Sequence, residues 1–303
     1  ATELANQALE GSEILESICG KRELESEDIL QHKFGIFTDQ VVKELEQEFS
    51  DEALQKSGLK KNSFCPLKDR LVVPYLDAEQ TYYFTGRVID GDDRPKYKKL
   101  VNTDYNENIL YTLLQGSDKL LLTEGPFDAI SAYKAGYDVA APITSSFPEK
   151  QEKKLVEIAK NYDEVLLAFD QDDAGDKGAD KTAKLLLQNR IDPRILEFTQ
   201  GQDLDDYTTF NGYDLTALEE SSDAYLNKLV EEAEKTDNRT KQYERFYNIL
   251  QLVQNHPPAF IDRLLRDIPV KKPVLEEELE QIRAETAKQQ AAEKEIDLSE
   301  SES

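Results

Sequence analysis

Carboxylate side chains gather in this sequence where apolar segments end. The stretch LLAFDQDDAGDKGA, residues 166–179, runs from a strand-like segment directly into Asp170 and Asp172. Side chains two residues apart at a strand end lie close together, and without a cation their repulsion would hold a proton on one of them. A divalent metal relieves this repulsion, and carboxylates without a nearby His or Cys favour a hard ion such as Mg²⁺ or Mn²⁺.

Further carboxylates follow other apolar segments. Glu124 closes the strand-like segment KLLLTEG, and Asp128 falls in the first turn of a helix opened by Pro126. Asp203 and Asp205 belong to GQDLDDY, which follows the last strand-like segment. If these strands are parallel neighbours, their acidic ends would meet and provide what a one- or two-metal phosphoryl-transfer centre needs.

Simpler roles exist for several of these acids. Asp128, Asp173 and Asp176 could serve only as acidic residues in the first turn of a helix, where they interact favourably with the helix dipole. For Asp173 and Asp176 this is the preferred interpretation. The acids of GQDLDDY could equally belong to an ordinary turn. For Glu124, Asp170 and Asp172, the strand-end position favours a functional role over a solvated acidic loop.

The elements that would position these side chains alternate along residues 118–198. Apolar strand-like segments alternate with amphipathic helical segments, which predicts an α/β fold with a parallel sheet flanked by helices. In order, the segments are KLLLTEG, PFDAISAYKAG, YDVAAPI, PEKQEKKLVEIAKNY, DEVLLAFD, AGDKGADKTAKLLLQNR and DPRILEF.

The flanking regions have a different character. Residues 3–57 show helical spacing of apolar residues, including EDILQHKFGI, and predict short helices. RLVVPYLD and TYYFTGRVID predict two strands, followed by the turn DGDDRP. After residue 207 the pattern is helical again, and it ends in a tail rich in Ser and Glu that is too polar to bury.

The overall charge limits the classes of function. The 303 residues carry a formal net charge of −25, which argues against a protein that coats nucleic acid non-specifically. Basic residues nevertheless outnumber acids between 60 and 99, so a local basic surface is expected. Two cysteines and two histidines, without a CxxC pair, do not encode a zinc module. No apolar run is long enough for a membrane span and no secretory signal is recognisable, so we expect a cytoplasmic protein.

LLLTEGPFDAISAYKAG and VLLAFDQDDAGDKGADKTAKLL together resemble the Toprim domain. Its pattern is a strand-end Glu-Gly with an Asp four residues after the Glu, followed by Asp-x-Asp at a later strand end. The matching residues are Glu124, Gly125, Asp128, Asp170, Asp172, Ala174 and Gly175. The resemblance implies metal-dependent nucleic-acid chemistry, since Toprim domains serve primases, topoisomerases, recombination proteins and nucleases.

The flanks narrow this resemblance to the catalytic core of bacterial-type (DnaG-like) primases. DRLVVPYLDAEQTYYFTGRVIDGDDRPKY is similar to their basic subdomain, which implies that Arg70, Arg87, Lys96 and Tyr97 face nucleotide or template phosphates. GQDLDDY resembles the family's acidic turn, which implies that Asp203 and Asp205 are further metal ligands beside Glu124, Asp170 and Asp172. Glu124, Asp128, Asp170 and Asp172 would form the catalytic set, with Glu124 either a ligand or a proton acceptor.

The resemblance also implies a domain order. We expect an N-terminal helical and basic α+β subdomain at 1–115, a Toprim domain at 116–210, a C-terminal helical subdomain at 211–283 and a disordered acidic tail at 284–303. The family's zinc-binding domain is absent from this sequence, which suggests a phage or mobile-element version that takes its targeting from a partner. The sequence departs from the family where KKL follows Lys96 and Tyr97, and at Thr144 and Ser145.

The implied activity is the synthesis of short RNA primers on single-stranded DNA from ribonucleoside triphosphates, with Mg²⁺ or Mn²⁺. A replicative helicase or a separate zinc-binding specificity protein is the implied partner, and no membrane is involved. Two alternatives remain open. One is a Toprim nuclease, although no tyrosine nucleophile is identifiable. The other is a non-catalytic replication adaptor that docks on a helicase.

Overall fold

The computed structural model describes residues 1–77, 80–89, 95, 97–100, 110–142, 149–199, 202–267, 277 and 279–288. The chain divides into two compact units, one formed by residues 1–179 and 196–221 and the other by 180–195 and 222–303. The subdomain boundaries expected at 115, 210 and 283 stay predictions. No helix of the described residues is long and apolar enough to cross a membrane.

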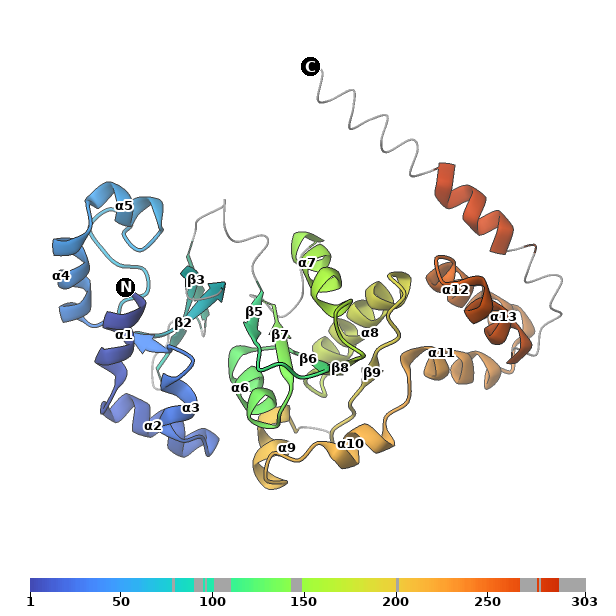
Figure 1. The fold of residues 1–303 in the computed structure, drawn as a ribbon, viewed down its shortest axis with the longest axis horizontal. Helices are drawn as coiled ribbons and strands as arrows, with labels where there is room; N and C mark the ends of the chain where they lie inside the picture. Colours follow the sequence, from blue (N-terminus) through green and yellow to red (C-terminus); the bar gives the residue numbers. More distant parts are fainter. Residues whose placement is uncertain are drawn as a thin grey trace, which may run out of the picture. The chain divides into compact units, whose positions relative to one another are not determined.

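Five short helices lie before strand β2 (Arg70–Asp77) in the sequence (Figure 1). They are α1 (Thr2–Leu9), α2 (Glu13–Arg22), α3 (Ser26–Leu30), α4 (Asp39–Glu48) and α5 (Asp51–Lys56). Three of them begin at a hydroxyl residue, Ser12, Thr38 or Ser50, whose side chain accepts a hydrogen bond from a backbone N–H of the first turn. The helical lead-in predicted over 3–57 is therefore confirmed for most of its length.

The prediction of helix over 27–36 was wrong at its C-terminal end. Helix α3 stops at Leu30, and Lys33 has a left-handed backbone with φ of 62°, which a helix does not accommodate. Residues Gly35–Ile36 form strand β1, which pairs with the next strand. Tertiary pairing thus overrides the helical spacing of this segment.

The first sheet has the strand order β1-β2-β3-β4, and its successive strands are antiparallel. Strands β2 (Arg70–Asp77) and β3 (Gln80–Val88) match the two predicted strands, whereas the short edge strand β4 (Tyr97–Lys99) was not predicted. Arg87 lies opposite Tyr97, and Thr85 lies opposite Lys99. Because side chains alternate between the faces of a strand, these four residues share one face.

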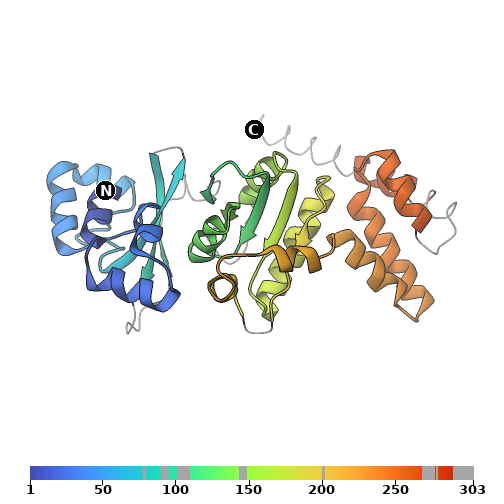
Figure 2. The same cartoon turned by 60° about the horizontal axis from the view of Figure 1, so that its bottom comes forward.

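The predicted parallel sheet is confirmed in the following region. The strand order is β5-β7-β6-β8-β9, with β6 parallel to both β7 and β8, and β5 antiparallel to β7. Figures 1 and 2 show helices α6 and α8 on opposite faces of this sheet. The elements are β5 (Tyr111–Leu113), β6 (Lys119–Thr123), α6 (Pro126–Lys134), β7 (Asp138–Ala141), α7 (Glu149–Ala159), β8 (Glu164–Ala168), α8 (Asp173–Gln188) and β9 (Arg194–Ile195).

One hydrophobic core runs through the first unit. Phe34 and Tyr75 from the N-terminal region belong to the same buried cluster as Leu121, Phe127 and Leu166 from the second sheet. The short helices α9 (Leu204–Phe210) and α10 (Thr216–Ser221) complete this unit. A shared core fixes the two sheets relative to each other, so side chains from both can form one site.

The second unit contains helices α11 (Tyr225–Glu234), α12 (Arg239–Val253) and α13 (Pro258–Asp267), as the sequence predicted. Residues 279–288 are also helical. The helical region thus continues five residues into the segment 284–303, whose remaining residues lie outside the described part of the chain.

Candidate active site

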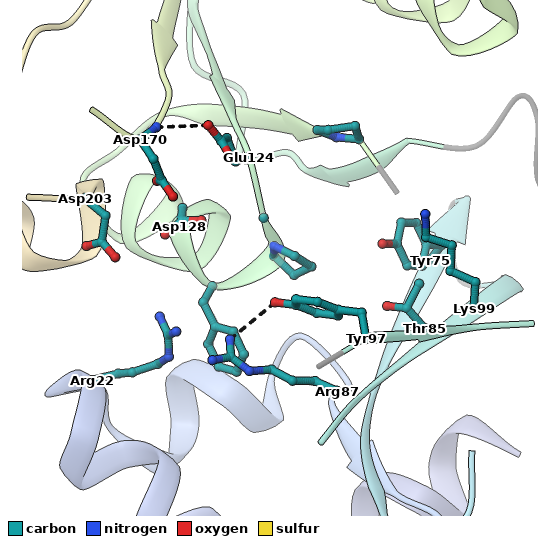
Figure 3. A pocket seen from close by; sticks show the side chains of 14 residues that line it. Arg22, Tyr75, Thr85, Arg87, Tyr97, Lys99, Glu124, Asp128, Asp170 and Asp203 are labelled. Atoms are coloured by element: carbon teal, nitrogen blue, oxygen red, sulfur yellow. Dashed lines mark hydrogen bonds between the residues drawn. The ribbon is translucent and has the colours of Figure 1, made fainter. Parts of the chain in front are cut away.

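A cavity of about 390 Å³ lies where the ends of the parallel strands face the first sheet (Figure 3). One wall is acidic, and the opposite wall is basic and aromatic. The acidic wall consists of Glu124, Asp128, Asp170 and Asp203. The other wall includes Arg22, Tyr75, Thr85, Arg87, Tyr97, Lys99 and Phe127.

Glu124 and Asp170 meet because their strands end level with each other. Thr123, the last residue of β6, lies opposite Ala168, the last residue of β8. The backbone N–H of Asp170 donates to Oε1 of Glu124 over 3.1 Å. Burial, together with the charges of Asp170 and Asp172, raises the pKa of Glu124 to about 7.

Asp128 lies in the first turn of α6, which begins at Pro126 as predicted. Burial is the main cause that raises its pKa to about 8, and the carboxylates of Asp203 and Asp170 add to the effect. Asp203 caps α9, because its Oδ1 accepts from the N–H of Asp206 over 2.8 Å. The acidic wall therefore holds like charges at a cost that a cation would relieve.

Gly175 permits the close approach of α8 to this wall. A Cβ atom at this position would lie 2.0 Å from the carbonyl oxygen of Asp170 and 2.7 Å from Oε1 of Glu124. No side chain fits there unless the two acidic residues move. The glycine thus fixes how close helix α8 packs against Asp170 and Glu124.

Two predicted metal ligands do not line the cavity. Asp172 precedes α8, and its Oδ1 accepts from the N–H groups of Ala174 and Gly175, each over 2.8 Å. Asp173 and Asp176 lie in the first turn of α8, as predicted, where an acidic side chain interacts favourably with the helix dipole. Asp205 is buried and accepts hydrogen bonds from Arg22 and Ser131.

The basic wall is organised around the ring of Phe127. The guanidinium of Arg22 lies 4.1 Å from the ring centroid, and that of Arg87 lies 4.9 Å from it. Arg87 also donates to the hydroxyl of Tyr97 over 3.3 Å. Such contacts hold both cations in place while their outer edges face the cavity.

Arg22 and Lys99 are cavity residues that the sequence reasoning missed. Arg22 is the last residue of α2 and lies far along the sequence from every motif, so only the tertiary fold reveals it. Lys99 belongs to the KKL segment, where the sequence departs from the family pattern. The alternation of side chains along a strand could have separated Lys99 from Lys98, had β4 been recognised.

Two of the four predicted phosphate-contacting residues, Arg70 and Lys96, are not found at the cavity among the described residues. Arg70 is 3% exposed, donates to the carbonyl of Pro95 over 2.9 Å and does not line the cavity. Lys96 lies outside the described residues, as do Thr144 and Ser145. Of the predicted basic and aromatic residues, the structure therefore brings Arg87 and Tyr97 to the cavity.

The acidic wall suits a hard divalent cation by its chemistry. Its donors are the oxygens of four carboxyl groups, and two of these groups, Glu124 and Asp128, have strongly raised pKa values. Within the described ranges, no three His, Cys, Asp or Glu side chains are already grouped around one point. This arrangement fits an ion such as Mg²⁺, which takes one or two carboxylates and completes its shell with water and phosphate oxygens.

Comparison with known proteins agrees with this architecture. Residues 121–208 match the model of the Toprim-like family. The chain is 26% identical to a DNA primase of Synechococcus elongatus over 281 residues, which are 84% of this chain but only 40% of that protein. This chain therefore spans about two fifths of the length of that relative.

Solved structures share the fold. The zinc-binding and RNA polymerase domains of the Aquifex aeolicus primase match with a TM-score of 0.77 at 20% identity, covering 90% of this chain and 72% of that one. A DnaG primase catalytic domain bound to single-stranded DNA matches with a TM-score of 0.66 at 20% identity, covering 93% and 92%. The fold is that of primase RNA polymerase domains.

Proposed function

Because residues 121–208 form a Toprim-like domain within a chain homologous to primase catalytic cores, we propose that this protein synthesises short RNA primers on single-stranded DNA. The observation that carries the proposal is the cavity in which four carboxylates face Arg22, Arg87 and Lys99. Nucleotide polymerisation needs these two features together, since one binds a metal and the other binds phosphates.

Each wall has a distinct task in this proposal. Asp128, Asp170 and Asp203 provide the oxygen atoms that would hold Mg²⁺ or Mn²⁺, whereas Glu124 is assigned to proton transfer. A bound cation would neutralise phosphate charge and lower the barrier to attack by the primer 3′-hydroxyl. Arg87 and Arg22 offer planar guanidinium groups that can contact phosphate oxygens in pairs, and Lys99 adds a point charge.

Glu124 is the proposed proton acceptor for the attacking hydroxyl. Without a cation the pKa of this carboxyl is about 7, and a cation bound nearby would lower it, so that the carboxylate is ionised and able to accept a proton at neutral pH. The hydrogen bond from the backbone of Asp170 fixes Oε1, so the proton would be taken at Oε2. The ribonucleotides and the template strand are the substrates that this proposal assigns to the cavity.

A primer-synthesis assay tests the proposal directly. The protein is incubated with single-stranded DNA, labelled ribonucleotides and either Mg²⁺ or Mn²⁺, and cleavage of the same DNA is followed in parallel. We expect short RNA products that Asp170→Asn abolishes. Asp172→Asn should cost less if Asp172 serves α8 rather than the cation. Cleavage without synthesis would favour a Toprim nuclease. The absence of both activities, even with a supplied helicase or zinc-binding partner, would favour an adaptor.

A further inference from the structure

Asp205 is held in a way that differs from the other strand-end acids. It is 6% exposed and lies in the first turn of α9. Its Oδ2 accepts from Nη1 of Arg22 over 2.7 Å, and its Oδ1 accepts from the hydroxyl of Ser131 over 2.6 Å. Both oxygens are therefore engaged by side chains from two other helices, α2 and α6.

These partners make Asp205 a poor metal ligand. A cation at Asp205 would have to approach the Arg22 guanidinium, which already neutralises this carboxylate at 2.7 Å. Asp203, two residues earlier, lines the main cavity, and Asp205 does not. The acidic turn therefore contains one residue that belongs to the carboxylate wall, Asp203, and one whose two oxygens are held by side chains of other helices, Asp205.

The basic wall depends on where Arg22 is held. Arg22, Arg87 and Phe127 line the main cavity and also a neighbouring cavity of about 250 Å³, which Asp205 lines as well. Asp128 and Asp203 are close by, and Arg22 lowers the pKa of Asp128. Without Asp205, Arg22 would no longer be held beside the ring of Phe127, which would remove a phosphate contact from the basic wall.

We propose that Asp205 is a positioning residue and not a metal ligand. It anchors Arg22 against the ring of Phe127, where Arg22 and Arg87 together receive the phosphates of a nucleic-acid strand or nucleotide. The buried Ser131, on the Toprim helix α6, holds the other oxygen of Asp205 and so ties the basic wall to the domain that carries the acidic wall. This inference rests on the proposed function for the identity of its ligand.

The test compares Asp205→Asn with Asp203→Asn in the full chain. Both substitutions remove one charge, and Asn can still cap α9 at position 203. Mn²⁺ affinity is measured by isothermal titration calorimetry, and the affinity for a labelled single-stranded oligonucleotide by fluorescence anisotropy at fixed salt. We expect Asp205→Asn to leave Mn²⁺ affinity within about twofold and to weaken DNA binding by about 5- to 10-fold. Asp203→Asn should weaken Mn²⁺ binding by about tenfold.

A double-mutant cycle adds a readout that a purely structural role would not move. Arg22→Gln should weaken DNA binding as Asp205→Asn does, and the double variant should be no weaker than the worse single variant. Equal losses of Mn²⁺ affinity in Asp205→Asn and Asp203→Asn would overturn the proposal. Independent effects of Asp205→Asn and Arg22→Gln on DNA binding would overturn it as well.

Two further outcomes remain decisive. If Asp205→Asn fails to fold, unchanged DNA binding by Arg22→Gln would refute the positioning role, because Arg22 is the residue through which Asp205 acts. If the parent protein binds Mn²⁺ and DNA but makes no primers, the proposed function fails. The Mn²⁺ and DNA affinities of the two Asp variants still decide the role of Asp205, because neither affinity depends on primer synthesis.

Discussion

Replacing Gly175 by alanine should greatly reduce primer synthesis while leaving the fold largely intact. The added Cβ would lie 2.0 Å from the Asp170 carbonyl oxygen, whereas real Cβ contacts essentially never fall below 3.0 Å. Asp170 or α8 must therefore shift by about 1 Å, and Oε1 of Glu124, 2.7 Å away, must give as well. A misplacement of about 1 Å can cost about 100-fold in rate, so we expect a loss of that size in primer synthesis.

Stability should change much less than activity. Crowding of the first turn costs about 1 to 3 kcal/mol, and alanine favours a helix over glycine by about 1 kcal/mol. The free energy of unfolding should therefore fall by no more than about 2 kcal/mol, measured by urea denaturation. Gly20→Ala in α2 is the matched control, because nothing lies within 4 Å of its added Cβ. Activity of Gly175→Ala within threefold of the parent would refute the reasoning.

Two further predictions concern charge. Lys99→Gln should weaken binding of single-stranded DNA and reduce the slope of log affinity against log salt by about 0.7. Lys98→Gln should do neither, because Lys98 lies on the same strand but does not line the cavity. Equal slopes for both variants would contradict a phosphate contact at Lys99. The pKa of Glu124 is raised from 4.5 to about 7, and that of Asp128 from 3.8 to about 8. Without a cation, the folded protein therefore holds protons on these carboxyl groups at a pH where the unfolded chain has released them. Its stability should fall as the pH rises from about 5 to 8. Thermal unfolding in a chelator should show this fall, and Asp128→Asn should reduce it; an undiminished fall would assign it to other groups.

The alternation of apolar and amphipathic segments was sufficient to predict the parallel sheet, because each of its central strands is four or five residues long and buried. It also predicted that Glu124 and Asp170 would meet, since Glu124 directly follows β6 and Asp170 lies two residues after the end of β8. Strands β1, β4 and β5 have two or three residues and form by pairing, so they carry too few positions to show a period.

The sequence could not predict which acid of each motif lines the cavity and which serves another role. Asp170 and Asp172 look equivalent in FDQDD, as do Asp203 and Asp205 in GQDLDDY. The differences arise from partners that no local pattern reveals, namely the first turn of α8 for Asp172 and a distant arginine for Asp205. The resemblance identified the right region for the basic residues, but it did not reveal that Arg70 is buried and donates to the carbonyl of Pro95.

The Arg22–Asp205 ion pair joins residues 183 positions apart, which bears on the order in which the protein is assembled during its synthesis. Translation adds about 5 to 20 residues per second, so Arg22 precedes its anchor on the ribosome by about 10 to 40 s. During that interval the growing chain already contains Glu124, Asp128 and Asp170. Arg22 therefore gains its anchor only after the acidic wall has been synthesised. A chain interrupted before residue 205 contains the first carboxylates together with an arginine that has not yet gained its partner.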